Sequence, residues 1–136
     1  MSVVVDTSVW SLFLRRAQPP EVWQVGALEN LIQERRVQML GIIRQELLSG
    51  IRETAQFSRL AQLLAGFPDL LATTSDHVLA AQCFNRCRSR GVQGSYIDFL
   101  ICAQAIHYEF SILSTDADFI RYAEHLPITL YPERLN

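Results

Sequence analysis

Five acidic residues lie just beyond short apolar segments or in the first turn of a predicted helix, where their carboxylates could act together. Clustered carboxylates repel one another and resist desolvation, so they need either protonation or a bound cation. Oxygen-only ligands with no Cys or His beside them favour Mg²⁺ or Mn²⁺ over Zn²⁺. Magnesium held by a few carboxylates and waters is the usual device for phosphoryl-transfer chemistry. The five acids are Asp6, Glu46, Asp98, Asp116 and Asp118.

Each of these carboxylates also has a purely structural interpretation. Asp98 and Asp118 each follow a Ser or Thr by three residues, a capping-box pattern in which the acid serves only the start of a helix. Asp116 could be a simple N-cap, and Glu46 could be a solvated helical residue. Asp6 is the hardest to explain in this way, because an acid at the end of a buried apolar strand is costly without a partner.

The acids can meet only if the elements that carry them form a parallel sheet. Short apolar runs alternate with segments of helical periodicity, which is typical of βαβ units with helices on both faces. Ligands of such α/β sheets bind beyond the carboxyl ends of the strands, so chemistry is expected at that edge. We expect strands at 2–5, 37–40, 70–72, 111–113 and 128–131, and helices at 9–15, 21–35, 42–49, 54–65, 75–90, 96–109 and 117–124. The expected N-caps are Thr7 or Ser8, Ser75, Ser95 and Asp116, with Pro19 and Pro20 as a break and Gly50 and Gly91 as helix ends.

Length and composition fit a single domain over residues 1–136. The chain is 49% apolar and 19% charged with a net charge of −2, which argues against disorder. It has no run of about 18 uncharged apolar residues, so no membrane span is predicted. Three Cys do not make a disulfide framework, and the start of the chain lacks the features of a signal peptide. A cytoplasmic location is therefore the default expectation.

Four segments around these acids together resemble a PIN domain, and most closely the VapC-type toxin ribonucleases of bacterial toxin–antitoxin pairs. They are VVVDTSVW from Val3, QELLSGI around Glu46, YIDFLICAQA around Asp98 and LSTDADF around Asp116. Each segment alone is a weak signal, but all four occur in order between Val3 and Phe119. The resemblance implies a three-layer α/β/α PIN-like fold around a short central parallel sheet.

The resemblance also implies a metal-dependent endoribonuclease that uses Mg²⁺ or Mn²⁺. The catalytic acids would be those at positions 6, 46, 98 and 116, with the cation held by Asp6, Asp98 and Asp116. Glu46 could hold a second cation or orient the attacking water. Asp118 matches an additional acid often found before Phe in the family. The hydroxyls of Thr7, Ser8 and Thr115 match auxiliary positions near the metal or its water.

As a VapC-type toxin, the protein would be a homodimer silenced by a VapB-like antitoxin. Apolar residues on and after the predicted helix 54–65 could belong to that partner surface or simply to the core; they are Phe57, Leu60, Leu64 and Phe67. Two alternatives remain open: a PIN nuclease of RNA processing or DNA without an antitoxin, and an inactive PIN-like binding module. Retention of all four family acids argues against the binding module.

Three arginines in five residues end the predicted helix before Asp98. Arg at a helix C-terminus is favourable in any protein, so a solvated helix end is the simpler interpretation. The alternative is an RNA phosphate clamp, because the guanidinium fork suits phosphate and the chain contains no Lys. The three residues are Arg86, Arg88 and Arg90, and Arg15 and Arg16 could serve in the same way.

The remaining aromatic and thiol residues have competing interpretations. Trp10 lies one helical turn after Asp6 and could stack on an RNA base, although packing in the core is the simpler interpretation. Trp23 is expected in the core or an interface. Cys83, Cys87 and Cys102 lie on two apolar helices, where small buried thiols are more common than a soft-metal site.

Overall fold

The structure is a computed structural model that describes residues 1–15 and 21–132. The expected chain break at Pro19 and Pro20 and the candidate phosphate ligand Arg16 lie outside these residues.

Five parallel strands form a sheet in the order β3-β2-β1-β4-β5. β1 is central, and Val3 pairs with both Val37 and Ser111. Its three valines are completely buried, as a parallel strand covered on both faces requires. The strands are β1 (Val3–Val5), β2 (Val37–Leu40), β3 (Asp69–Leu70), β4 (Ser111–Leu113) and β5 (Thr129–Leu130).

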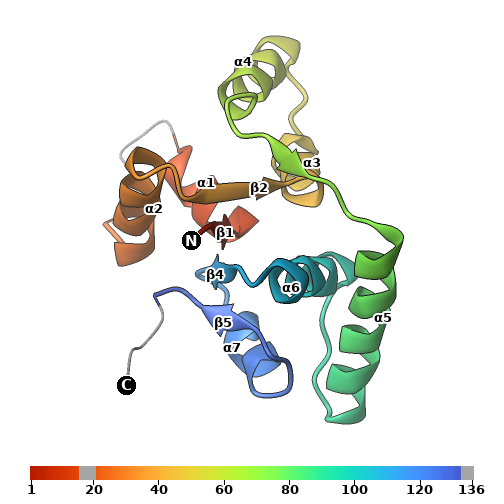
Figure 1. The fold of residues 1–136 in the computed structure, drawn as a ribbon. Helices are drawn as coiled ribbons and strands as arrows, with labels where there is room; N and C mark the ends of the chain where they lie inside the picture. Colours follow the sequence, from red (N-terminus) through yellow and green to blue (C-terminus); the bar gives the residue numbers. More distant parts are fainter. Residues whose placement is uncertain (16–20, 133–136) are drawn as a thin grey trace.

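Helices cover both faces of the sheet, so the predicted α/β/α layering is confirmed. In Figure 1, α2 lies on one side of the strands, whereas α6, with α5 packed against it, lies on the other. α4 packs on α3 and projects from one end of the molecule. The helices are α1 (Thr7–Phe13), α2 (Trp23–Gln33), α3 (Gly41–Leu48), α4 (Thr54–Leu64), α5 (Thr74–Ser89), α6 (Tyr96–Tyr108) and α7 (Asp118–Ala123).

Several predicted boundaries were wrong by a few residues. α1 begins at Thr7, directly after Asp6, so neither Thr7 nor Ser8 is its N-cap. α7 begins at Asp118, and the residue before it is Ala117 rather than the predicted cap Asp116. The hydroxyls of Thr7 and Ser8 and the carboxylate of Asp116 instead form hydrogen bonds at the sheet edge, as described below. β3 ends at Leu70, two residues earlier than predicted, because the chain leaves the sheet there with Leu71 exposed.

The N-terminus of α5 is held by Thr73 and Asp76, not by the predicted cap Ser75. The Thr73 hydroxyl accepts from the Asp76 amide, and the Asp76 carboxylate accepts from the Thr73 amide, which makes a complete capping box. Asp76 is fully buried and also contacts His107 Nδ1 at 2.7 Å. Burial alone would raise the pKa of Asp76, but these hydrogen bonds hold it below its usual value.

The most apolar predicted helix does lie in the core. α6 buries Phe99, Ile101 and Cys102, among others, and Ser95 caps it as expected by accepting from the Asp98 amide at 3.0 Å. All three cysteines are buried and free, and burial raises the pKa of Cys83 to about 11, so its thiol is inert. Within the described ranges, no helix has the length and apolar character needed to cross a bilayer.

Candidate active site

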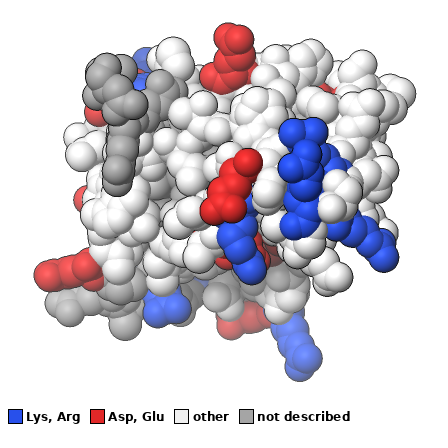
Figure 2. All heavy atoms as spheres, turned by 90° about the horizontal axis from the view of Figure 1, so that it is seen from below, with Lys and Arg blue, Asp and Glu red and all other residues white. Residues whose placement is uncertain are grey.

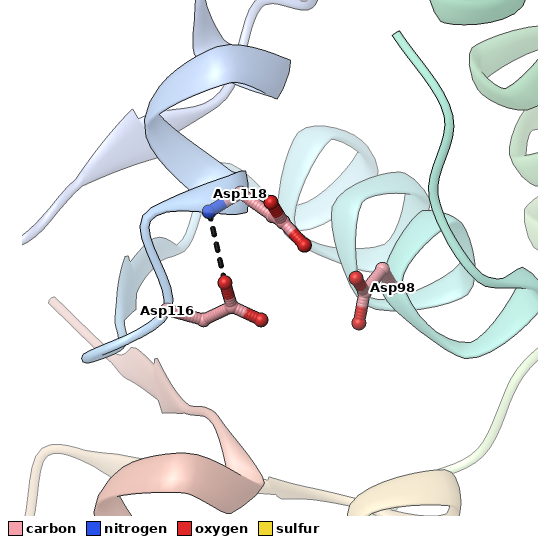
Figure 3. Close-up of side chains that lie close together, drawn as sticks. All are labelled: Asp98, Asp116 and Asp118. Atoms are coloured by element: carbon pink, nitrogen blue, oxygen red, sulfur yellow. Dashed lines mark hydrogen bonds between the residues drawn. The ribbon is translucent and has the colours of Figure 1, made fainter.

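Three carboxylates gather at the carboxyl edge of the sheet. Asp98 comes from the start of α6, Asp116 from the loop after β4, and Asp118 from the start of α7. Figure 3 shows their side chains pointing toward a common space. One oxygen from each lies within 4.8 Å of the others, and in the described part of the chain this is the only acid, His or Cys group that meets that spacing. Three of the five predicted acids therefore meet at this edge, whereas Asp6 and Glu46 do not belong to this group.

Asp6 lies beside this group and is held by two hydroxyls. Its side chain is only 6% exposed. Ser8 and Ser114 each donate to its Oδ2 atom at 2.8 Å. The backbone amide of Thr115 donates to the Ser8 hydroxyl at 3.1 Å, and the auxiliary role expected of the Thr115 hydroxyl stays a prediction. Ser114, which sequence reasoning missed, is the first residue after β4 and so occupies the same place there that Asp6 occupies after β1.

The Asp98 carboxylate is aimed into the site by a tyrosine. The Tyr122 hydroxyl donates to Asp98 Oδ2 at 2.7 Å, and Tyr122 itself is completely buried. The Ser95 hydroxyl caps the Asp98 backbone amide, whereas the Tyr122 hydroxyl bonds the Asp98 carboxylate. The capping alternative for Asp98 therefore accounts for its amide and not for its side chain.

The negative charge of Asp98 is disfavoured in the metal-free protein. Burial raises the pKa of its carboxyl group above its usual value, and the neighbouring charges of Asp6 and Asp116 raise it further. Hydrogen bonds from Tyr122 and Ser95 act in the opposite direction without cancelling these effects. A carboxylate in this position is stabilised best by a cation beside it.

Glu46 lies outside the three-carboxylate group, whereas Asp118 belongs to it. Glu46 accepts a hydrogen bond from the Thr7 hydroxyl at 2.8 Å, which ties it to the residue next to Asp6. Asp118 forms an ion pair with Arg121, one turn along α7, so one member of the group has a partial counter-charge. The Asp116 carboxylate accepts from the Asp118 amide at 2.9 Å, so Asp116 also steadies the start of α7.

The donor set of this site suits a hard divalent cation. Every candidate ligand atom in the group is a carboxylate oxygen, and no Cys or His belongs to it. Mg²⁺ and Mn²⁺ prefer such ligands and are held by a few carboxylates with waters completing the coordination shell. The residues present therefore fit the expected metal, with Asp118 joining Asp98 and Asp116 more closely than sequence reasoning anticipated.

Trp10 does not belong to the site, which corrects its inclusion among the RNA-binding candidates. Its side chain is 1% exposed and packs edge-on against Phe13 and Phe67, with ring centroids 6.1 and 5.2 Å away. A ring enclosed in this way cannot stack on a base. The buried residues of α1 are Val9 and Trp10, so the residue one turn after Asp6 faces the core.

The three arginines at the end of α5 are exposed. Figure 2, the view from below Figure 1, shows basic side chains gathered on the side where α5 ends. Arg86 is partly engaged, because its Nε atom donates to the His125 carbonyl at 2.7 Å. Arg88 and Arg90 remain candidates for contact with phosphate.

The parallel sheet between two layers of helices, with carboxylates at its carboxyl edge, places the chain in the class of α/β proteins. Comparison with known proteins gives the family. The model of the PIN domain family matches residues 3–125. The chain therefore belongs to the PIN domain family. No curated protein sequence matches it in a direct comparison.

Solved structures share the fold along nearly the whole chain. A chain of FitAcB from Neisseria gonorrhoeae is 22% identical with a TM-score of 0.74, covering 95% of this chain and 96% of that one. A chain of VapBC2 from Rickettsia felis, bound to a DNA fragment from its promoter, is 15% identical with a TM-score of 0.76, covering 96% and 97%. A chain of VapBC-5 from Mycobacterium tuberculosis, a toxin–antitoxin system, is 20% identical with a TM-score of 0.69, covering 98% of each.

Proposed function

We propose that this protein is a divalent-cation-dependent endoribonuclease that acts as the toxin of a toxin–antitoxin pair. The observation that carries the proposal is the convergence of Asp98, Asp116 and Asp118, with Asp6 adjacent, at the sheet edge of a PIN domain. An acid group with a raised pKa at Asp98 is poorly suited to a purely structural role, because it weakens the metal-free fold.

The residues divide into ligands and positioning groups. Asp6, Asp98 and Asp116 would hold Mg²⁺ or Mn²⁺, and Asp118 would join them, since its carboxylate lies close to those of Asp98 and Asp116. When bound, the cation would activate a water and neutralise charge on the phosphodiester. Ser8 and Ser114 fix the Asp6 carboxylate, while Tyr122 fixes that of Asp98.

Glu46 has a separate task on the Asp6 side of the site. The Thr7 hydroxyl holds one of its oxygens, and the other can orient a water or contribute to a second cation. The in-line hydrolysis of an RNA phosphodiester needs a water on one side of the phosphate and stabilisation of the leaving oxygen on the other. Glu46 lies outside the three-carboxylate group, so it suits the task of orienting this water.

The toxin assignment is supported by the fold and by an apolar surface. The similar structures named above include toxin–antitoxin complexes. In this chain, α1, α3 and α4 border a hollow of about 420 Å³, and Leu63 in its wall is 52% exposed. Phe57 on α4 is also exposed, whereas Leu64, expected as a possible partner contact, is fully buried and belongs to the core.

A VapB-like antitoxin with an apolar helix and a basic C-terminal segment would fit the exposed apolar surface of α4 and the acid group. Its helix would cover the apolar residues of α4, and its basic residue would enter the acid group. The alternative of a PIN nuclease without an antitoxin has no such use for the exposed face of α4.

The substitution Asp98→Asn tests this function. Asn keeps the shape of the side chain and leaves the Ser95 cap intact, but it removes a metal-ligand charge. We expect cleavage of RNA by the wild-type chain in Mg²⁺ or Mn²⁺, no cleavage in EDTA, and a loss of at least about 100-fold in the variant. Expression of the wild-type chain, but not of the variant, should also arrest growth until an antitoxin is supplied.

Glu29→Gln is the matched control, because Glu29 is an exposed acid on α2. It should cleave at the wild-type rate. Retained cleavage by Asp98→Asn, or full activity of the wild type in EDTA, would defeat the proposal.

A further inference from the structure

A hollow of about 320 Å³ adjoins the acid group. It lies between the start of α2, the loop after β4 and α7, and β5 also contributes to its wall. Asp116 lines this hollow and also belongs to the three-carboxylate group. The hollow and the candidate active site therefore share a wall.

The most prominent side chain in this wall is Trp23, the first residue of α2. It is 57% exposed, although it was expected in the core or an interface, and it contrasts with the enclosed Trp10. Ile120, on the opposite side of the hollow, is similarly exposed. Tyr131 also lines the hollow, but the Arg36 guanidinium already lies over its ring, 5.8 Å from the centroid. Trp23 is thus the open aromatic side chain in the wall of this hollow, as far as the structure describes it.

The wall also contains groups that can form hydrogen bonds. Gln24 and Thr115 line the hollow next to Trp23 and Asp116. An aromatic face combined with amide and hydroxyl groups is the usual means of binding an unstacked nucleobase, which offers both a π-face and a polar edge.

We propose that this hollow is a nucleobase subsite, in which Trp23 stacks on a base of single-stranded RNA next to the phosphate that is cut. This inference rests on the proposed function, since an RNA with its phosphate at the acid group must place a neighbouring base close to Asp116. The base is the uncharged part of the nucleotide, so it can lie against a wall that contains a carboxylate. Stacking tolerates any base, whereas Gln24 and Thr115 can discriminate among base edges.

The chain offers a direct optical test, because Trp10 and Trp23 are its only tryptophans. In the non-cleaving Asp98→Asn background, an unstructured 12-nucleotide RNA should quench the Trp23 emission, and the remaining emission of buried Trp10 should stay constant. In the same background, Trp23→Phe should show no quenching. An oligonucleotide of the same length with abasic sugars should bind more weakly and quench little.

Affinity gives the second measurement. Trp23→Ala should bind the RNA roughly 5- to 150-fold more weakly, the range measured for loss of one base–aromatic stack. Trp23→Phe should recover most of the affinity, because it keeps an aromatic face. Phe57→Ala is the matched control: it removes another exposed ring, on α4 outside the hollow, and should leave RNA binding unchanged. In the chain that retains Asp98, the affinity for Mn²⁺ should be the same with and without Trp23.

The outcomes separate this inference from the function on which it rests. If the wild type cleaves RNA but Trp23→Ala binds it as tightly as the parent, or the abasic oligonucleotide quenches equally well, the base subsite is wrong and the nuclease stands. If a protein partner quenches Trp23 and RNA does not, the hollow is a protein contact and the inference is overturned. If the wild-type chain neither binds nor cleaves RNA, both proposals are wrong.

Discussion

Asp98 carries a charge that the metal-free protein accommodates poorly. Because burial and the charges of Asp6 and Asp116 raise the pKa of its carboxyl group, the protonated form is more favourable in the folded state than in the unfolded state. A carboxyl group whose pKa is raised on folding contributes stability that is complete below its unfolded pKa and is lost as the pH rises through its folded pKa. In the metal-free protein, ionised Asp98 therefore destabilises the fold near neutral pH.

We expect Asp98→Asn to melt at a higher temperature than the wild type in EDTA at pH 7. The difference should shrink as the pH falls toward 3.8, the ordinary pKa of the group, because the wild-type side chain then becomes neutral as well. Thermal melting of both proteins across this pH range measures the effect. A lower melting temperature for Asp98→Asn at pH 7 would instead show that the carboxylate stabilises the start of α6.

The acids of the site could be predicted from the sequence, whereas the residues that position them could not. Asp6 and Asp116 are found because parallel strands bring their carboxyl ends to one edge. Ser114 and Tyr122 act through single hydrogen bonds to residues more than 20 positions away, and no periodicity encodes such a contact. Tyr122 has the pattern of an ordinary core aromatic residue, and it does occupy the core except for its hydroxyl.

At the scale of elements, the alternation of short apolar runs with helical segments located each helix and strand that the structure describes, but the caps were less predictable. Thr7 and Ser8 are typical N-cap residues, yet their hydroxyls bond to Glu46 and Asp6. Local rules for helix starts assume that a side chain serves its own backbone. At a functional site the same side chain bonds to a distant residue, so α1 begins without a side-chain cap.

The packing of α7 against α6 sets the direction of the Asp98 carboxylate. Tyr122 on α7 reaches Asp98 past Gly94, and a Cβ atom at Gly94 would lie 2.8 Å from Tyr122 Cζ and 2.9 Å from Phe99 Cε2. We expect Tyr122→Phe to weaken Mn²⁺ binding and cleavage by about 10-fold or more, as is typical when a group that orients a metal ligand is removed. Gly94→Ala should have a similar effect, because the tyrosine ring must move.

Titration with Mn²⁺, monitored by electron paramagnetic resonance, measures the Mn²⁺ affinity of Tyr122→Phe independently of activity. Gly26→Ala on α2 is the control, because a Cβ atom at this position meets nothing within 4 Å. It should leave Mn²⁺ binding unchanged and stabilise α2 by up to about 1 kcal/mol. Wild-type Mn²⁺ affinity in Tyr122→Phe would show that this hydrogen bond only supports the core.

At the scale of the whole molecule, the strand order explains why one edge collects the chemistry. With β1 between β2 and β4, the segments that follow these three strands lie side by side, and they contribute Asp6, Glu46 and Asp116. The chain is nearly neutral overall, with a net charge of −2, yet three carboxylates gather here while basic side chains gather where α5 ends. The distribution of charge, and not its sum, separates a metal site from a surface suited to phosphate.

This concentration of charge leads to a prediction for the stability of the whole domain. A cation that binds only the folded state stabilises it by about 2.7 kcal/mol at 100 times its dissociation constant. For a domain of this size we expect Mn²⁺ at that concentration to raise the melting temperature by roughly 10 °C. Asp98→Asn should show little shift and Glu29→Gln the full shift, both measured by differential scanning calorimetry against EDTA. An equal shift in Asp98→Asn would mean that Mn²⁺ binds elsewhere on the surface, and the acid group would then lose its role as the metal site.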